Sequence, residues 1–162
     1  MIRYAVPADV KAILNLRARA WPAAYQNYVS PDVIERVTSM TAEKENKILT
    51  QIKAGDVLVV EQDQNIVGYA LINRDSDELK QLYVDPDLKR HGIGTLLFQA
   101  VQKDLKARGV NQMVVWTMKD YPVSNAFYRK QGGILTDRQM RLKINIDTVM
   151  YLFQLKGKTK CR

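Results

Sequence analysis

The sequence has one cysteine and one histidine, and neither has the partners that its usual chemistry needs. Cys161 has no second thiol, so an intrachain disulfide is excluded, which favours a reducing, cytoplasmic setting. It also has no neighbouring histidine, so covalent catalysis through this thiol is not expected. No group of Cys, His, Asp and Glu residues has metal-ligand spacing, and we expect no metal site.

Long apolar runs are also missing. No segment approaches the roughly 20 apolar residues that span a bilayer, and no apolar stretch follows the first residues. We therefore expect neither a membrane span nor a secretory signal. Repeats, linkers and low-complexity stretches are absent as well. The 162 residues predict one domain over residues 1–156, followed by a basic tail over 157–162.

Acidic residues are fewer than basic ones, and the formal charge is +8. A basic protein can bind nucleic acid through the phosphates. Here the basic residues are scattered, and no nucleic-acid-binding motif is present. We favour the alternative that a basic surface attracts a small polyanion, and a nucleic-acid-binding domain remains the less favoured hypothesis.

A glycine loop between a strand and a helix is the most informative segment, and it reads LYVDPDLKRHGIGTLL over residues 82–97. A helix N-terminus presents unpaired N–H groups and a partial positive charge, and glycines let a ligand approach the backbone closely. Three basic residues add positive potential: Lys89, Arg90 and His91. This pattern predicts a phosphate or pyrophosphate site. The alternative is a strand-to-helix turn whose glycines serve geometry alone.

The familiar phosphate loops do not fit this segment. A dinucleotide fingerprint needs a third glycine where Leu97 stands, and a P-loop needs Lys and Ser/Thr directly after Gly94. The segment instead resembles motif A of the GCN5-related N-acetyltransferases, in which Gln/Arg-x-x-Gly-x-Gly/Ala follows a Val-x-Pro strand end. Here KRHGIG follows Val84-Asp85-Pro86, with Lys89 in the first position. That loop binds largely through backbone N–H groups, so the Lys changes little.

A second match lies downstream and in the same order. The segment FYRKQGG, residues 127–133, resembles the family's motif B, a short helix that ends Phe-Tyr-Glu-Lys-x-Gly-Phe/Gly. The family often has Asn where Tyr121 stands, and that Asn commonly touches the cofactor, so this contact is not carried over. The first strand and the helix from Asp9 to Trp21 also resemble the family, which extends the likeness over nearly the whole chain.

The expected elements alternate between helical and strand periodicity. Strands are expected at 2–5, 57–60, 66–72, 78–84, 113–117, 134–144 and 148–155, and helices at 9–21, 31–39, 42–53, 92–109 and 123–131. This order predicts a single-domain α/β fold with a mixed, mostly antiparallel sheet flanked by helices. Strands 78–84 and 112–118 flank a crossover helix and should be parallel neighbours. The resemblance implies that this pair splays apart.

The resemblance also implies acetyl-CoA as a cosubstrate, bound between those two parallel strands. Its pyrophosphate would meet the backbone of the glycine loop, and its pantetheine arm would pair with the edge of the preceding strand. The residues expected to bind it are Leu82, Tyr83, Val84, Lys89, Arg90, His91, Gly92, Ile93, Gly94 and Thr95.

Acetyl transfer to an amine requires a proton acceptor for the ammonium and a proton donor for the leaving thiolate. Tyr128 stands at the family's usual position for the donor, and the alternative is a core aromatic. Some relatives carry a catalytic Glu where Trp116 stands, so that role is not transferable. Glu78 occupies a position at which other members have a carboxylate, and it is equally compatible with a solvated charge. His91 more naturally faces phosphate or solvent.

The resemblance therefore implies an N-acetyltransferase that moves an acetyl group from acetyl-CoA to a primary amine by direct transfer in a ternary complex. The acceptor would be a small molecule or the amino group of a peptide or protein. A non-catalytic acyl-CoA sensor on the same fold is the alternative. An aromatic group, Trp21, Tyr25 and Tyr28, fits a packed loop better than acceptor contacts. The sequence leaves open whether the chain forms a homodimer.

Overall fold

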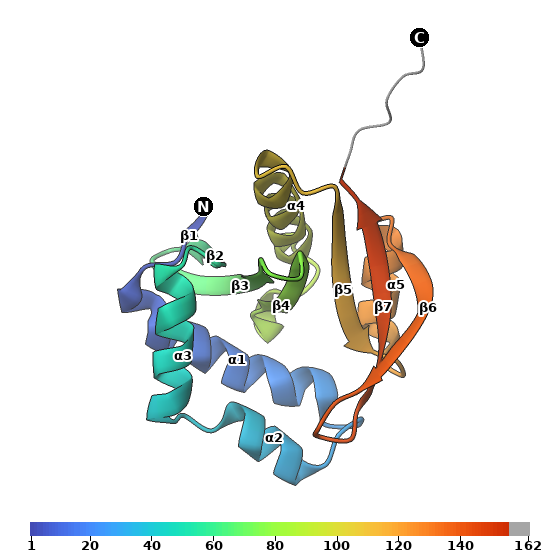
Figure 1. Ribbon diagram of the computed structural model, residues 1–162. Coiled ribbons are helices and arrows are strands. Elements are labelled where there is room, and N and C mark those ends of the chain that lie inside the picture. Colours follow the sequence, from blue (N-terminus) through green and yellow to red (C-terminus); the bar gives the residue numbers. More distant parts are fainter. Residues whose placement is uncertain (156–162) are drawn as a thin grey trace.

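A seven-stranded mixed sheet forms the centre of the molecule in the computed structural model, which describes residues 1–155 (Figure 1). Its strand order is β1-β2-β3-β4-β5-β7-β6. The strands are β1 (Ile2–Tyr4), β2 (Val57–Gln62), β3 (Asn65–Asn73), β4 (Glu78–Val84), β5 (Gln112–Met118), β6 (Ile134–Arg141) and β7 (Asp147–Gln154). All neighbouring strands are antiparallel except β4 and β5, which are parallel. The predicted fold class is confirmed, and the basic tail predicted at 157–162 lies outside the described residues.

Helices cover both faces of this sheet (Figure 1). They are α1 (Val10–Tyr25), α2 (Pro31–Thr38), α3 (Ala42–Lys53), α4 (Ile93–Ala107) and α5 (Pro122–Lys130), with short 3-10 turns at Pro7–Asp9 and Pro86–Leu88. Apolar residues of α1 and α3 pack with β2, β3 and β4 in one core cluster. Residues of α4 and Tyr128 of α5 pack in a second cluster with β2 to β5 and β7. The two faces therefore present different helices to the same strands.

The first helix is longer than the sequence indicated. It continues through Pro22 to Tyr25 rather than ending at Trp21. A proline deprives only one carbonyl of its helical hydrogen bond. The ring of Trp21 packs edge-on against that of Tyr25, with centroids 4.7 Å apart, and this contact holds the last turn. Tyr25, which was expected in a loop after this helix, is thus part of it.

The parallel pair separates soon after it begins. Glu78 and Val114 are the register partners of β4 and β5, and the Val114 N–H donates to the Asp77 carbonyl at 3.0 Å. From there β4 keeps its pairing with β3 up to Val84, while β5 pairs with β7 along its whole length. The expected splay between β4 and β5 is confirmed, and it leaves one edge of β4 without a strand neighbour.

Close packing brings α4 onto the strands beside this opening. A Cβ atom on Gly68 of β3 would lie 2.9 Å from side-chain atoms of both Ile93 and Leu97. Such a distance is too short for real contacts, so a side chain at this position would displace the Ile93 and Leu97 methyl groups that pack α4 against β3. The start of α4 is therefore fixed directly above the end of β4.

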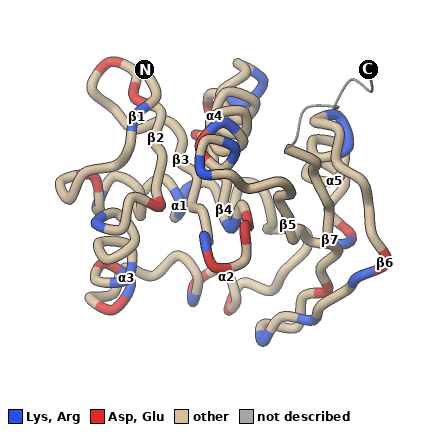
Figure 2. The backbone as a smooth tube through the Cα atoms, turned by 45° about the horizontal axis from the view of Figure 1, so that its top comes forward, with Lys and Arg blue, Asp and Glu red and all other residues tan. Residues whose placement is uncertain are grey.

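Charged positions are spread over the backbone rather than gathered on one side (Figure 2). Lys and Arg positions lie among Asp and Glu positions on α2, α3, α4 and the outer strand β6, whereas α1 and α5 carry only basic positions. Among the described residues, no helix has the length and apolar character needed to cross a membrane.

Candidate active site

The glycine loop has the backbone geometry of an anion-binding turn. Arg90 has φ 67° and Gly92 has φ 79°, both in the left-handed region, and Gly92 is the N-cap of α4 without any side-chain cap. Within residues 1–155 no acceptor bonds the N–H groups of Ile93, Gly94 or Thr95. These three donors and the helix dipole point to the same place, which suits a phosphate group.

Side chains around this loop leave the space open. Lys89, Arg90 and His91 are exposed, and the His91 Nδ1 atom lies 3.0 Å from the Lys89 carbonyl. Gly94 faces Phe127, and a Cβ atom there would lie 3.6 Å from the Phe127 ring, an ordinary contact. Gly92 therefore serves the backbone angle, whereas Gly94 is not sterically required by the chain itself.

The free edge of β4 carries the three residues predicted to hold the pantetheine arm. Leu82, Tyr83 and Val84 pair with β3 on one side and have no β5 partner on the other. Backbone N–H and C=O groups on an unpaired edge are ready to bond an extended, amide-containing chain. The structure thus brings the predicted edge residues and the glycine loop together at one end of β4.

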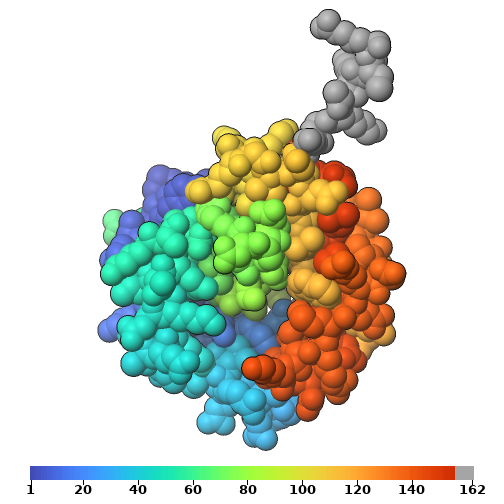
Figure 3. All heavy atoms as spheres, in the orientation of Figure 1, coloured from blue at the N-terminus to red at the C-terminus, as the bar shows by residue number. Residues whose placement is uncertain are grey.

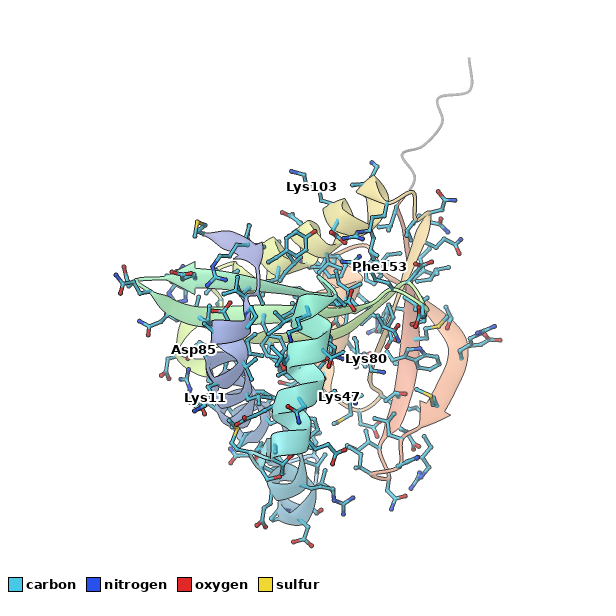
Figure 4. All side chains as sticks on the ribbon, turned by 60° about the vertical axis from the view of Figure 1, so that its left-hand side comes forward. Lys11, Lys47, Lys80, Asp85, Lys103 and Phe153 are labelled. Carbon is cyan, nitrogen blue, oxygen red and sulfur yellow. The ribbon has the colours of Figure 1, made fainter. Side chains whose placement is uncertain are left out.

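Tyr128 lies in α5 with its ring in the core beneath α4. The ring is 8% exposed and packs near those of Phe98, Phe127, Tyr151 and Phe153. Figure 4 shows Phe153 on this side of the sheet, under α4. Burial raises the pKa of the Tyr128 phenol well above its ordinary value, with a smaller contribution from Tyr83. The hydroxyl is therefore protonated at neutral pH and can donate a proton.

An aromatic cluster connects Tyr128 to the opposite face of the sheet. The Trp21 indole N–H donates to the Tyr83 hydroxyl at 2.8 Å. Tyr121 packs edge-on against Tyr25 at 5.0 Å between ring centroids. Burial raises the pKa of Tyr25, and the nearby Tyr83 and Tyr128 hydroxyls raise it further. The Trp21–Tyr83 bond and the Tyr25–Tyr121 contact thus join the end of α1 to β4 and to the start of α5.

Tyr28, the third predicted aromatic, packs on Tyr121 at 5.2 Å but is 45% exposed. Its position lies just after α1. Figure 3 shows a hollow near the α1 and α2 surface. There the yellow-green surface that includes β4 meets the blue surface of α1 and α2 and the orange surface of the C-terminal strands. This hollow opens on the α1 and α2 side of the splayed strands.

A β-bulge determines which face Glu78 occupies. The β3–β4 register shifts between Leu71 and Ile72 and leaves Lys80 as the extra residue of β4. Lys80 is exposed, as Figure 4 shows. Leu79 packs in the α4-side core, so its neighbour Glu78 points to the α1 side, because side chains alternate along a strand. Gln81 beyond the bulge also points there and accepts a hydrogen bond from Tyr69 at 2.9 Å.

Glu78 nevertheless lies at the closed end of the pair. Its Oε2 atom accepts a hydrogen bond from the Ser76 hydroxyl at 3.2 Å. Four residues at about 3.3 Å each separate it from Leu82, a span of roughly 13 Å along the strand. A proton from an acceptor amine near Leu82 would reach this carboxylate through water rather than directly.

Asn125 supports the site and was missed by the sequence reasoning. Its amide donates to the Tyr121 carbonyl at 2.8 Å and the Met118 carbonyl at 3.0 Å, and its Oδ1 accepts from the Tyr151 hydroxyl at 2.7 Å. These bonds fix the start of α5 against β5 and β7, and so position Tyr128 three residues later. A buried polar residue inside a short helix was the available signal.

Arg17 was also missed. It falls four residues after Ile13, on the buried stripe of α1, and is partly buried. Its Nε atom is shielded from solvent and has no hydrogen-bond partner among the described residues. The signal in the sequence was a charged residue at an apolar position of the helical repeat.

A separate groove of about 430 Å³ lies between α5 and the outer strands, lined in part by Lys119, Arg129 and Gln139. It is on the far side of β5 from the free edge of β4. It contains none of the predicted site residues, and we do not assign the chemistry to it.

A family model covers most of the chain, including the segments that build this candidate site. The model described as the acetyltransferase (GNAT) family matches residues 10–133, well over half of the chain. The chain belongs to this family. The matched span includes the glycine loop, both splayed strands and Tyr128, and the enzyme class predicted from the sequence, an N-acetyltransferase, is confirmed.

Relatives and solved structures agree with the family. Spermidine N(1)-acetyltransferase of Thermoplasma acidophilum is 23% identical over 136 residues, which cover 80% of this chain and 84% of the relative. The PaiA N-acetyltransferase of the same organism, solved with coenzyme A, has a TM-score of 0.81 at 21% identity and covers 93% of this chain and 96% of its own. A Salmonella typhimurium structure with acetyl-CoA has a TM-score of 0.73 at 23% identity and covers 97% of this chain and 94% of its own. These structures share the fold of this chain.

Proposed function

We propose that this protein transfers the acetyl group of acetyl-CoA to a primary amine by direct attack within a ternary complex. The observation that carries the proposal is the splay of β4 from β5, with free backbone donors of α4 at one end and a hollow beside α1 and α2 on the other face. Two substrates can thus approach one opening from opposite faces of the sheet.

Acetyl-CoA is the cosubstrate, as predicted. The residues present fit it, because the three free N–H groups at the start of α4 suit a pyrophosphate and the unpaired edge of β4 suits the pantetheine amides. Lys89 and Arg90 are exposed beside the loop and add positive charge to it. A backbone N–H of Leu82 to Val84 would stabilise the oxyanion that develops on the acetyl carbonyl.

The transfer itself needs balanced proton movements. The amine nitrogen attacks the acetyl carbonyl carbon, a new C–N bond forms, and the C–S bond to coenzyme A breaks. The departing thiolate takes the proton of the Tyr128 hydroxyl, which burial keeps protonated. The proton lost by the amine passes through water to Glu78, which shares the α1 face of β4 with Tyr83 and Gln81. Glu78 then releases its proton to solvent, and Tyr128 is reprotonated from solvent.

The sensor hypothesis is less well supported by the site. A sensor that only binds the cofactor needs neither an opening on the opposite face of the sheet nor a buried, protonated phenol beside the cofactor site. Tyr121, in place of the family's usual Asn, packs against Tyr25 at the end of α1, the helix on the acceptor side. The substitution therefore shapes the acceptor side, which favours an enzyme.

A thiol-release assay with acetyl-CoA and a panel of amines tests this function, with mass spectrometry of the products. We expect amine-dependent release of coenzyme A and an acetylated amine of 42 Da added mass, a value fixed by replacing one hydrogen with an acetyl group. Tight coenzyme A binding without amine-dependent release across the panel would support the sensor and contradict the enzyme.

A further inference from the structure

Arg17 has no carboxylate partner among the described residues, unlike several other arginines of the chain. Arg3, Arg19, Arg74 and Arg141 each lie within 3.0 Å of an Asp or Glu oxygen. Arg17 forms no salt bridge in residues 1–155, and its Nε atom is buried without a hydrogen bond. A shielded guanidinium donor without a partner is unfavourable, and a bound carboxylate would satisfy it.

Arg17, with its unbonded Nε donor, lies on the acceptor side of the sheet. It lies on α1 one turn before Trp21, whose indole N–H bonds the Tyr83 hydroxyl at 2.8 Å. Four helical residues rise about 6 Å, so Arg17 is within reach of the same strand. The Tyr69 and Tyr83 rings lie 5.6 Å apart on that face. Burial raises the pKa of Tyr83, and the positive charge of Arg17 partly offsets that rise, which places the charge close to the hydroxyl.

Nearby groups do not supply the missing anion. Lys44 on α3, whose pKa is lowered by burial and by the Arg17 charge, is another cation. The Lys44 ammonium donates hydrogen bonds to carbonyls at the end of α2 and just after it, including that of Ser39 at 2.8 Å. Glu78 occupies the same face of β4 but makes no ion pair with Arg17 in the described chain. The face therefore holds a guanidinium free to bind and a carboxylate free to accept a proton.

We propose that Arg17 binds a carboxylate of the acceptor, so that the acceptor is a small amino acid-like molecule with both an amine and a carboxylate. This inference rests on the proposed function and names its substrate class. Guanidinium forms directional hydrogen bonds to carboxylates, often two at once, and would orient the amine toward the opening between β4 and β5. A polyamine carries no anion for Arg17 and would be repelled by it.

Paired substrates test the carboxylate directly. Glycine, β-alanine, 4-aminobutyrate, L-leucine and L-phenylalanine are each compared with the corresponding amide, and spermidine represents the polyamines. We expect at least one amino acid to exceed its amide tenfold or more in kcat/KM. Arg17→Gln should abolish this preference for the acid over its amide, and Arg17→Lys should keep part of the preference. Lys11→Gln, which removes an equal charge from an exposed position of α1, should keep all of it.

A binding measurement separates this inference from the function on which it rests. Calorimetry with coenzyme A present compares the N-acetyl amino acids with the N-acetyl amides. Binding of the acids alone, lost in Arg17→Gln, supports the carboxylate site even if no amine is acetylated. Equal turnover of acids and amides, preference for spermidine, or a preference that survives Arg17→Gln would overturn the inference while acetyl transfer itself stands.

Discussion

At the scale of single residues, the site depends on one phenol that burial keeps protonated. Tyr128 lies among aromatic rings, so its hydroxyl keeps its proton through the pH range in which an amine begins to lose its own. An acid that is always protonated is available on each catalytic cycle. The same rise in pKa makes Tyr128 a weaker acid than an ordinary tyrosine, so its proton transfer to the thiolate costs more.

Tyr128→Phe should lower kcat about 100-fold, the lower end for loss of a general acid. Coenzyme A affinity should change little, because the hydroxyl is not among the groups expected to hold the pyrophosphate or the pantetheine arm. The measurement is steady-state thiol release with calorimetry of the same variant.

Tyr151→Phe is the matched control for that substitution. It removes another buried hydroxyl from the same aromatic cluster, one that donates to Asn125 at 2.7 Å. We expect it to cost stability, about 1 to 3 kcal/mol for the acceptor left without a donor, and, because this bond helps to fix α5, to cause a loss of turnover well below the hundredfold loss of Tyr128→Phe. Equal turnover in wild type and Tyr128→Phe, where chemistry limits the rate, would remove Tyr128 from the mechanism.

Glu78→Gln should reduce the rate most at low pH, where the acceptor amine is fully protonated. As pH approaches the amine's own pKa, free amine is already present, and the defect should shrink. The measurement is kcat/KM from about pH 6 to 10, the range over which a lysine-like amine begins to deprotonate. A defect of constant size would show that Glu78 shapes the site or binds acceptor charge. Absence of any defect would leave bulk water as the proton acceptor.

At the scale of elements, the loop that joins β4 to α4 is where we propose that the cofactor binds. The loop depends on Gly92 for its left-handed angle, and the open start of α4 depends on the absence of a side-chain cap. Gly109 ends the same helix with φ 83°, and a Cβ atom at either glycine would meet nothing within 4 Å. The two glycines thus have the same backbone requirement at opposite ends of one helix.

Gly92→Val should weaken coenzyme A binding at least tenfold, about 1.4 kcal/mol, because a branched side chain strains the loop and covers its N–H groups. Gly109→Val imposes the same backbone strain and should lower stability similarly while leaving affinity unchanged. Calorimetry and thermal unfolding of both variants make the comparison. Unchanged affinity in a folded Gly92→Val protein would contradict the placement of the pyrophosphate.

Elements with a clear period were predictable from the sequence, and features set by tertiary contacts were not. The apolar stripe of α4 and the glycines at its ends determine a helix locally, and the resemblance supplied the splay between β4 and β5. The bulge at Lys80 depends on pairing with β3, and the helical turn after Pro22 depends on packing of Trp21 against Tyr25. That Arg17 has no partner depends on what surrounds it in space, which no periodicity reveals.

At the scale of the whole molecule, buried phenols should make the fold sensitive to alkali. Burial raises the pKa values of Tyr69, Tyr83 and Tyr128 in the folded state. Below about pH 9 both folded and unfolded states keep these protons, so stability does not depend on them. Above about pH 10 the unfolded chain loses protons that the folded chain retains, and the free energy of unfolding falls by up to ~1.4 kcal/mol per pH unit for each phenol.

Guanidinium chloride unfolding at pH 8, 9, 10 and 10.5 measures this loss. Stability should be flat at the lower values and decline at the upper ones, and Tyr69→Phe should make the decline shallower by removing one of these phenols. Stability that is unchanged up to pH 10.5, or a decline identical in Tyr69→Phe, would show that these phenols ionise equally in both states.

The two faces of the splayed strands, one for the cofactor and one for the acceptor, are the central claim for the whole molecule. Initial rates of thiol release, measured while acetyl-CoA and an accepted amine are varied together, test it most directly. Direct transfer in a ternary complex predicts intersecting double-reciprocal lines and no release of coenzyme A without amine. Parallel lines, or a burst of free thiol from acetyl-CoA alone, would show an acetylated enzyme and contradict the account.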